Sequence, residues 1–483
     1  MSQKKQNPAF LRFKQLGKDY LITNDFGNHV FLLPQQFQKL IAGKLTRGRT
    51  YETLVEKGFI KDKINWAQAI MRYQKGHVSL LQGTSLHIMV VTLRCDTKCV
   101  YCQASSRPMN SRGYDMDKKT AKKIIDFIFQ TPSPTITIEF QGGEPLANWP
   151  VVKFVVEYAR KKEKSTKKHL FIGLVSNFNM MTQERLDFLM KNYVGMCTSL
   201  DGPEFLHNLN RPFPNNNSYQ ITTKWIKKIQ EITEEQRKTS KKFYELSALV
   251  TISKQSLQYP KEIIDEYLKH GFRGIHLRPL NYLGSAQKSG EKIGYSTQEF
   301  LNFWRKSMDY ILSLNLKGTP FLERGTMIIL EKILKGGDPG YADLRSPCGA
   351  TISQMLYNYD GKIYTCDEGR MREDDSFMIG DINHKPSSES KEKAFYENIV
   401  SGEKVKTVIV ASTLDNSPCD YCVYKPYCGV CPVLNYIAHE NLTPQIHNTD
   451  WCQRHQGIFY YIFEKLKNKK TAEIFKRWVK IND

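Results

Sequence analysis

Three cysteines stand close together in the segment TLRCDTKCVYCQAS, where Cys95, Cys99 and Cys102 have the spacing C-x3-C-x2-C. Thiolates are soft ligands that suit iron–sulfur chemistry, and one loop with three of them can hold three irons of a [4Fe-4S] cluster. The fourth iron would then lack a protein ligand and could bind a small molecule. Zinc is the alternative metal, but no fourth Cys or His lies nearby to complete a tetrahedral site. The spacing therefore predicts a reactive iron–sulfur centre rather than a closed electron carrier.

Seven further cysteines occupy the C-terminal part of the chain in the order C-x12-G-x4-C, then C-x2-C-x5-C-x2-C, then a last cysteine. Clustered cysteines in a chain without a secretory signal indicate metal ligands rather than disulfides. A structural zinc ribbon is the alternative to iron–sulfur clusters, because C-x2-C pairs also bind zinc. The eleventh cysteine, Cys197, lies in an apolar run, and we expect it to be a buried, unreactive thiol. The seven are Cys348, Cys366, Cys419, Cys422, Cys428, Cys431 and Cys452.

The elements that must position these cysteines alternate between apolar runs and amphipathic stretches of helical period from Leu86 to Gly284. Such alternation predicts a parallel sheet with right-handed crossovers. Six units form either an open sheet or part of a barrel, and both arrangements place chemistry at the carboxyl ends of the strands. The predicted strands are Leu86–Leu93, Thr135–Gln141, Leu170–Asn177, Met196–Leu200, Glu245–Ile252 and Gly274–Leu280.

Polar residues lie in and after these predicted strands. The second strand is followed by Gly142-Gly143-Glu144-Pro145, where two glycines would let the backbone approach a ligand closely and Glu144 offers an acceptor to an ammonium group. Within that strand, Glu139 and Gln141 share one face, which could line a barrel interior and touch a substrate. A surface or ion-paired position is the alternative for Glu139. On the sixth strand, Arg278 is a candidate substrate contact.

The cysteine triad, with the aromatic Tyr101 before its last member, resembles that of the radical S-adenosylmethionine (radical SAM) enzymes. The GGEP string resembles the family's motif for the methionine amino group, and the segments with Ser176, Ser199 and Arg211 resemble its later strand ends. The resemblance implies a partial (β/α)6 TIM-like radical SAM barrel in which S-adenosylmethionine is cleaved to a 5′-deoxyadenosyl radical that abstracts hydrogen. Strand-end capping and a surface arginine are the alternative roles for these later residues. The implied S-adenosylmethionine contacts are Gly142, Gly143, Glu144, Ser176, Ser199 and Arg211.

The seven C-terminal cysteines resemble the SPASM extension of radical SAM peptide-modifying enzymes. The resemblance implies two auxiliary [4Fe-4S] clusters. The family usually has three residues between the two cysteines that correspond to Cys428 and Cys431, whereas this chain has two. Some relatives also have an eighth cysteine shortly before the one that corresponds to Cys348, and this chain has none there. The second auxiliary cluster is therefore expected to have a site that is open, or that a substrate or a residue such as Asp343 fills. The implied ligands are Cys419, Cys422, Cys428 and Cys452 for one cluster and Cys348, Cys366 and Cys431 for the other.

Asp367, directly after Cys366, resembles a position that accepts a proton in some SPASM relatives. A substrate radical that loses a proton and an electron needs a base beside an electron sink, so Asp367 is the candidate catalytic residue. Support of the neighbouring cluster is the alternative role for its carboxylate.

The other parts of the chain are expected to form smaller units around the barrel, which occupies residues 84–290. Residues 1–80 are expected to form a winged-helix-like unit that contains a hairpin. This unit would either bind a leader peptide at the edge of its sheet or cap the barrel. Residues 291–345 are expected to form a helical bridge, 346–455 the SPASM domain, and 456–483 a C-terminal helix.

Composition excludes several classes of protein. A chain of 483 residues exceeds the size of one core, and 40% hydrophobic and 12% aromatic residues exclude a disordered protein. No secretory signal or membrane span is expected, so the chain is predicted to be cytoplasmic. Lys and Arg outnumber Asp and Glu by 70 to 49, and this excess would attract nucleic acid, anionic lipid or acidic peptides. Most of these charges are expected on ordinary solvated faces.

Most of the chain is similar to the His-Xaa-Ser system radical SAM maturases, on the segments YLITNDFGNHVFLL, GTSLHIMVVTLRCDTKCVYCQASS, TITIEFQGGEP and SLDGPEFLHNLNR. This implies an oxidoreductase that modifies a ribosomally made peptide or protein, with an external electron donor and in some systems a second maturase as partners, and with no nucleic acid or membrane partner. One alternative is a radical SAM enzyme that modifies RNA, which the charge favours and the seven cysteines disfavour. The other is a non-catalytic iron–sulfur electron-transfer protein.

Overall fold

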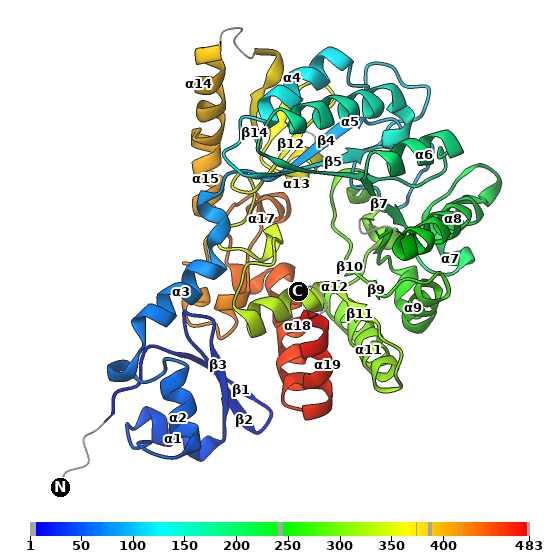
Figure 1. The fold of residues 1–483 in the computed structure, drawn as a ribbon. Helices are drawn as coiled ribbons and strands as arrows, with labels where there is room; N and C mark the ends of the chain where they lie inside the picture. Colours follow the sequence, from blue (N-terminus) through cyan, green and yellow to red (C-terminus); the bar gives the residue numbers. More distant parts are fainter. Residues whose placement is uncertain (1–5, 240–244, 373, 385–388, 416, 481–483) are drawn as a thin grey trace.

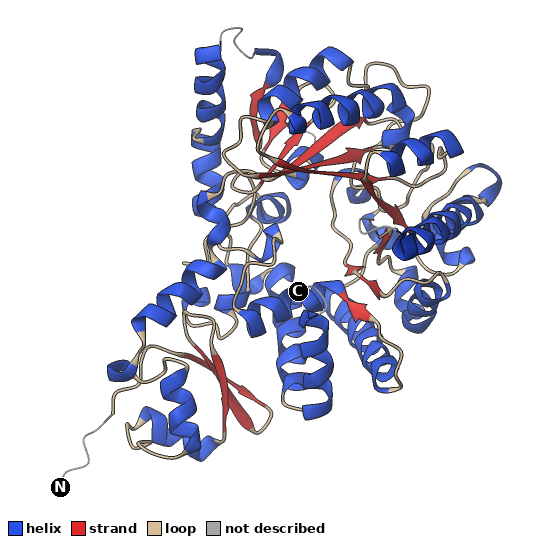
Figure 2. Cartoon of the chain, in the orientation of Figure 1, coloured by secondary structure: helices blue, strands red, loops and turns tan. Residues whose placement is uncertain are grey.

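The computed structural model describes residues 6–239, 245–372, 374–384, 389–415 and 417–480 of the chain. Its described residues form one curved sheet of nine strands, with helices along the outside of the curve (Figures 1 and 2). A three-stranded sheet lies apart from it, near the N-terminus. The predicted α/β fold class with a parallel sheet is confirmed.

Six parallel strands form the barrel part of the large sheet, as the repeated pattern predicts. The sixth predicted strand is interrupted at His276, and its first half, β9 (Gly274–Ile275), pairs instead with β11 (Leu322–Glu323). The six strands, in sheet order, are β4 (Leu86–Thr92), β5 (Thr135–Gly142), β6 (His169–Val175), β7 (Val194–Ser199), β8 (Ser247–Thr251) and β10 (Leu277–Arg278).

The connecting helices cover the outer face of the sheet because each has one apolar side. In β5, Ile136, Ile138 and Phe140 are fully buried and alternate with polar residues, so the apolar set packs toward the helices and the polar set faces the opposite way. The helices are α4 (Lys118–Ile128), α5 (Trp149–Lys164), α6 (Gln183–Lys191), α7 (Glu204–Asn210), α8 (Ser218–Thr239) and α9 (Pro260–Lys269).

The cysteine-rich segment extends the sheet, which the sequence did not predict. Strand β12 (Gln354–Tyr357) pairs in parallel with β4, and β13 (Lys362–Tyr364) and β14 (Met378–Asp381) follow in antiparallel order. These strands have three or four residues, and β12 is buried throughout, so no alternation marks them. The helices of this segment are α13 (Asp367–Met371), α14 (Glu389–Val400), α15 (Glu403–Ala411), α16 (Ser417–Asp420) and α17 (Pro432–His439).

The bridge and the C-terminus differ from the expected simple helices. The bridge contains α10 (Gly290–Ile293), α11 (Thr297–Leu316), strand β11, α12 (Arg324–Leu330) and a π-helical turn (Glu331–Lys335). The C-terminal segment forms two helices rather than one, α18 (Asp450–Leu466) and α19 (Lys469–Lys480). The break lies at Asn468, whose side chain accepts a hydrogen bond from the N–H of Lys470 at 3.0 Å and so starts the second helix. No helix in the described ranges is both long and apolar enough for a bilayer crossing.

The N-terminal unit has its own small core of Ile22, Leu32, Leu54 and Phe59, among others. The predicted hairpin is confirmed, and Asn24 closes its turn by accepting a hydrogen bond from the Asn28 N–H at 3.1 Å. The unit consists of β1 (Arg12–Leu16), β2 (Asp19–Thr23), β3 (His29–Leu32), α1 (Pro34–Ile41), α2 (Arg49–Glu56) and α3 (Trp66–Gly76).

Candidate functional site

A cavity of about 850 Å³ lies at the carboxyl ends of the barrel strands and gathers most of the predicted site residues. They come from the ends of β4, β5, β6 and β7, from α7 and from the first turn of α13. Segments far apart in the sequence therefore face one space, as the barrel arrangement predicts. The predicted residues that line this cavity are Cys95, Cys99, Cys102, Gly142, Gly143, Glu144, Ser176, Ser199, Arg211 and Asp367.

The cysteine triad (Cys95, Cys99 and Cys102) occupies the loop that follows β4. Backbone hydrogen bonds fix this loop, for example from the Cys95 N–H to the Arg107 carbonyl at 2.8 Å. Burial raises the pKa of Cys99 to about 12 and also raises that of Cys95, so these thiols lose their protons readily only to a metal. Three soft sulfur donors on one loop facing a cavity fit an iron–sulfur cluster with one iron open to a ligand.

Arg211 lies beside the triad rather than at the surface. Its Nε donates to the Asp201 carboxylate at 3.1 Å, and its Nη1 lies 3.6 Å from the sulfur of Cys99. The Tyr101 hydroxyl also donates to Asp201, and the guanidinium lies over the Tyr101 ring at 5.4 Å. The position of Asp201 in the SLDGP segment does not by itself indicate this role. The buried carboxylate fixes one side of Arg211 and so presents its positive charge to the triad.

Glu144 is tied to its own chain more closely than the sequence predicts. Its carboxylate is 1% exposed and accepts hydrogen bonds from the Leu146 N–H at 3.0 Å, the Ser176 hydroxyl at 2.8 Å and the Asn177 N–H at 2.8 Å. Burial raises the pKa of Glu144 to about 7. The Ser176 oxygen in turn accepts the Phe178 N–H at 3.0 Å. Ser176 therefore has the capping contacts of a strand end, and Glu144 joins the ends of β5 and β6.

The two glycines of the GGEP string are needed where β5 passes the end of β4. A Cβ on Gly142 would lie 2.4 Å from the carbonyl oxygen of Thr92, and one on Gly143 would lie 2.3 Å from that of Arg94. Gly142 also has φ +125°, which favours glycine. The close approach that requires glycine is thus to the protein's own backbone, at the base of the triad loop.

Asn177 connects the triad loop to β6, a link that the sequence does not reveal. Its amide nitrogen donates to Asp96 Oδ1 at 2.7 Å and lies 3.0 Å from Thr97 Oγ1. Both partners lie between Cys95 and Cys99 in the sequence. The amide therefore helps to hold the triad loop over the cavity.

The polar face of β5 lines the barrel interior, which was one of the two alternatives for Glu139. Glu139 accepts a hydrogen bond from Gln141 at 2.6 Å, and burial raises the pKa of its carboxyl group. Cys197 is only partly buried and lines the same cavity, which differs from the full burial predicted for it. Burial raises the pKa of its thiol to about 11, as expected for an unreactive thiol. One face of β7 packs in the core and the other, with Cys197 and Ser199, faces the cavity, so an apolar run alone did not reveal its direction.

The C-terminal cysteines fall into two groups in space. The four-cysteine set, Cys419, Cys422, Cys428 and Cys452, lines one small cavity of about 50 Å³. The three-cysteine set, Cys348, Cys366 and Cys431, packs in a separate buried cluster with 4%, 2% and 4% exposure. The close neighbours Cys428 and Cys431 thus belong to different sets, despite the short spacing between them. All seven are soft sulfur donors, and both sets fit iron–sulfur ligation.

The three-cysteine set adjoins the barrel cavity through α13. Cys366 caps this helix by accepting the Gly369 N–H at 3.4 Å, and Asp367 on the first turn lines the cavity. Arg278 also lines the cavity, as expected for a strand-end residue. Burial, and then the charge of Asp367, raise the pKa of Asp343. Asp367 therefore stands between the three-cysteine set and the space that the triad faces.

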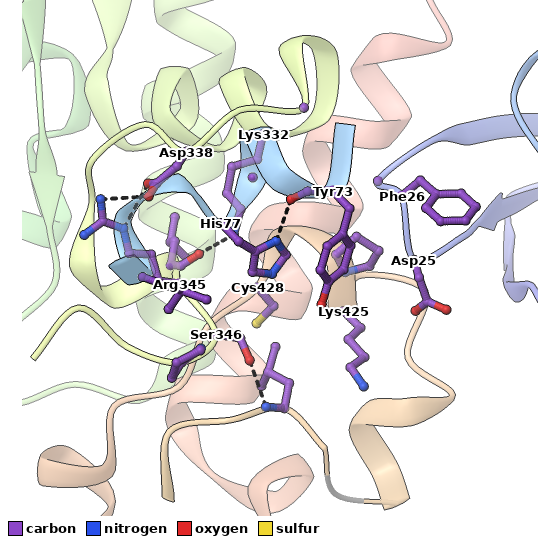
Figure 3. Close-up of a pocket in the computed structure, with 18 of the residues that line it drawn as sticks. Asp25, Phe26, Tyr73, His77, Lys332, Asp338, Arg345, Ser346, Lys425 and Cys428 are labelled. Atoms are coloured by element: carbon purple, nitrogen blue, oxygen red, sulfur yellow. Dashed lines mark hydrogen bonds and ion pairs between the residues drawn. The ribbon is translucent and has the colours of Figure 1, made fainter. Parts of the chain in front are cut away.

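A further cavity of about 380 Å³ lies where the N-terminal unit meets the bridge and the four-cysteine set (Figure 3). Cys428 lines both this cavity and the small one of its set. Lys332, from the π-helical turn, donates to the Leu344 carbonyl, and burial lowers its pKa to about 8. Arg345 forms an ion pair with Asp338 at 2.8 Å. The cavity thus brings one cysteine of the set to the boundary with the N-terminal unit.

Comparison with known proteins identifies the barrel. Residues 89–239 match the family model described as the Radical SAM superfamily. These residues form a radical SAM domain. The chain is 23% identical over 394 residues to the cysteine-type anaerobic sulfatase-maturating enzyme of Clostridium perfringens (strain 13 / Type A), covering 80% of this chain and 97% of the enzyme. It is 28% identical over 144 residues to the uncharacterized protein MJ0907 of Methanocaldococcus jannaschii and spans about half of that protein, 48%.

Two solved structures share the radical SAM fold of this chain. The structure described as native anSMEcpe with bound AdoMet has a TM-score of 0.65 and 18% identity, covering 80% of this chain and 99% of that chain. The structure of Streptococcus suis SuiB bound to the precursor peptide SuiA has a TM-score of 0.52 and 14% identity, covering 91% of this chain and 98% of that chain. The fold around the radical SAM domain is thus similar over most of the chain.

Proposed function

We propose that the protein is a radical SAM enzyme that oxidatively modifies a ribosomally made peptide or protein. One observation carries the proposal: the triad from the β4 loop and Asp367 from the cysteine-rich segment line the same cavity of about 850 Å³. The loop that carries the cluster ligands and a carboxylate that can act as a base thus face the same cavity. This arrangement suits abstraction of a hydrogen atom followed by removal of a proton. The similarity to a sulfatase-maturating enzyme and to a structure with a precursor peptide supports a peptide substrate.

In this proposal the triad would hold one [4Fe-4S] cluster with one iron open to S-adenosylmethionine. When bound, the pair would supply radical chemistry for the removal of a hydrogen atom from an unactivated C–H bond. Arg211, 3.6 Å from Cys99, places a positive charge where the methionine carboxylate of S-adenosylmethionine can be bound. Ser199 offers a hydroxyl from the cavity face of β7. Gly142 and Gly143 let the end of β5 pass close to the base of the triad loop, and Glu144 joins the ends of β5 and β6.

Asp367 is proposed to accept the proton that the oxidised substrate releases. It is on the cavity wall, one residue from Cys366, so a proton acceptor lies beside the three-cysteine set. Glu139, Gln141 and Arg278 line the same space and are proposed to contact the substrate. The cavity wall is therefore polar where the peptide would lie.

The two C-terminal sets are proposed to hold two auxiliary [4Fe-4S] clusters. The four-cysteine set provides a complete set of protein ligands, and the three-cysteine set leaves one position without cysteine. An external electron donor is a required partner, because cleavage of S-adenosylmethionine is reductive. The cavity beside Cys428 offers one approach to the four-cysteine set (Figure 3).

The N-terminal unit is proposed to bind the leader of the substrate. Strand β1 lies at one edge of its three-stranded sheet, and Phe13 on this strand is 53% exposed. Residues 6–82 carry twelve Lys and Arg against five Asp and Glu, which favours an acidic leader. A peptide that adds a strand to this edge would gain backbone hydrogen bonds as well as charge complementarity.

The substrate is proposed to be a His-Xaa-Ser repeat peptide in the cytoplasm, with a second maturase as a further partner in some systems. The test is co-expression of this protein with a repeat-bearing peptide encoded beside it, followed by the intact mass of the peptide. A mass change that requires Cys99 and that Asp367→Asn reduces is the expected result. An unmodified peptide, together with a modified RNA from the same cells, would instead favour the RNA-modifying alternative.

A further inference from the structure

The three-cysteine set is one ligand short for a cubane cluster, and the structure places two carboxylates next to it. Helix α13 begins directly after Cys366 with Asp367 and Glu368. The sulfur of Cys366 and one oxygen of each carboxylate all lie within 4.8 Å of one another. A ligand from the chain itself is therefore within reach of the position that the cysteines leave unfilled.

The two carboxylates are hydrogen-bonded to each other, but only one of them lines the barrel cavity. Asp367 lines the barrel cavity, whereas Glu368 is not among the described residues that line it. Successive residues of a helix are about 100° apart around its axis, so one acid can face the cavity while the next faces the cysteines. Asp367 is thus available to the substrate and Glu368 to the three-cysteine set.

The three-cysteine set packs in one buried cluster, and its cysteines are not among the described residues that line the barrel cavity. Glu368 shares both features, because its carboxylate lies within 4.8 Å of the Cys366 sulfur and does not line that cavity. Glu368 is therefore the acid of α13 that lies beside the set and away from the substrate space.

We propose that Glu368 is the fourth protein ligand of the iron–sulfur cluster held by Cys348, Cys366 and Cys431. This rests on the proposed function, which assigns that set an auxiliary cluster. A carboxylate is a harder ligand than a thiolate and binds iron less firmly than cysteine does in such clusters. One iron of this cluster would be held more loosely than the other three, and the cluster would be closed by protein until Glu368 is displaced.

The test compares variants of anaerobically reconstituted protein by iron content and electron paramagnetic resonance, without any activity assay. Replacement of Cys95, Cys99 and Cys102 by alanine first removes the triad cluster, so that only the auxiliary clusters contribute. In that background, Glu368→Ala is expected to lose about one iron per chain and to show the signal of a three-iron cluster after mild oxidation. Glu368→Cys is expected to restore the iron, because it supplies a thiolate at the same place.

Two matched variants separate Glu368 from its neighbours. Asp343→Ala and Asp367→Asn should keep the full iron content and the four-iron spectrum. Loss of iron in Asp343→Ala but not in Glu368→Ala would overturn the proposal in favour of Asp343, and full iron with an unchanged spectrum in Glu368→Ala would overturn it outright. The signal of the four-cysteine cluster in each variant reports that the domain is folded. Zinc or no metal at the three-cysteine set in the starting protein would contradict the proposed function itself.

Discussion

Removal of the Asp201 charge should reveal how far the site depends on its buried ion pair with Arg211. The Asp201 side chain is fully buried and accepts hydrogen bonds from Arg211 and from Tyr101. Asp201→Asn keeps the shape of the side chain but leaves Arg211 as an unpaired buried cation. Breaking one partner of such a pair costs ~3–5 kcal/mol, because the remaining charge is left without compensation. We expect the free energy of unfolding of the metal-free protein to fall by this amount.

A double-mutant cycle on Asp201 and Arg211 should show the coupling between the two buried charges. Arg211→Gln should be destabilising as well, because it leaves the Asp201 carboxylate unpaired in a buried position. The double variant should lose less than the sum of the two single losses, since neither charge is then left alone. Urea unfolding at pH 7, followed by the fluorescence of the six tryptophans, measures these differences.

An exposed ion pair provides the matched control. Lys406 and Glu403 lie 2.7 Å apart with side chains that are 59% and 88% exposed, so Lys406→Gln should cost only ~0.2–1 kcal/mol. If Asp201→Asn lowers the free energy of unfolding no more than Lys406→Gln does, the buried ion pair does not have the stabilising role assigned to it. A double variant that loses the full sum of the single variants would refute it too.

Two further predictions concern pH and steric fit. His87 is fully buried on β4, and burial lowers its pKa to about 3. Because the folded protein holds this imidazole neutral, the contribution of His87 to the free energy of unfolding is complete above pH 6.5 and is lost as the pH falls toward 3. His87→Gln should therefore flatten the acid side of the unfolding curve by up to ~1.4 kcal/mol per pH unit, and an unchanged slope would contradict this. Gly143→Ala would place a Cβ 2.3 Å from the Arg94 carbonyl, so it should lower the iron bound by the triad. Gly195→Ala, whose Cβ meets nothing closer than 3.7 Å, should keep the iron, and equal iron contents would contradict the steric argument.

The fold of the barrel could be predicted because each strand carries a local signal. Long apolar runs such as that of β4 and the alternation in β5 give strand positions directly. Strands β12 to β14 lack such a signal, because they are short and all four residues of β12 are buried. The split of the C-terminal segment at Asn468 depends on one capping side chain, which the overall helical pattern does not emphasise.

The candidate site was predictable in its cysteines and less so in its hydrogen bonds. The resemblance to the SPASM extension implies that Cys428 and Cys431 bind different clusters, and the structure places them in different sets. The engagement of Glu144 by Ser176 and Asn177 depends on how the ends of two strands meet, which no local pattern encodes. The same holds for Cys197, whose direction is set by the face of β7 that packs against the helices.

The central claim is that the triad holds a cluster whose open iron binds and cleaves S-adenosylmethionine. The most direct measurement is the release of 5′-deoxyadenosine from S-adenosylmethionine by anaerobically reconstituted, reduced protein. The wild-type protein should release it, and Cys99→Ala should release none while it keeps the iron of its two C-terminal sets. Reduced wild-type protein that carries its iron and never releases 5′-deoxyadenosine would contradict the account and favour a non-catalytic electron-transfer protein.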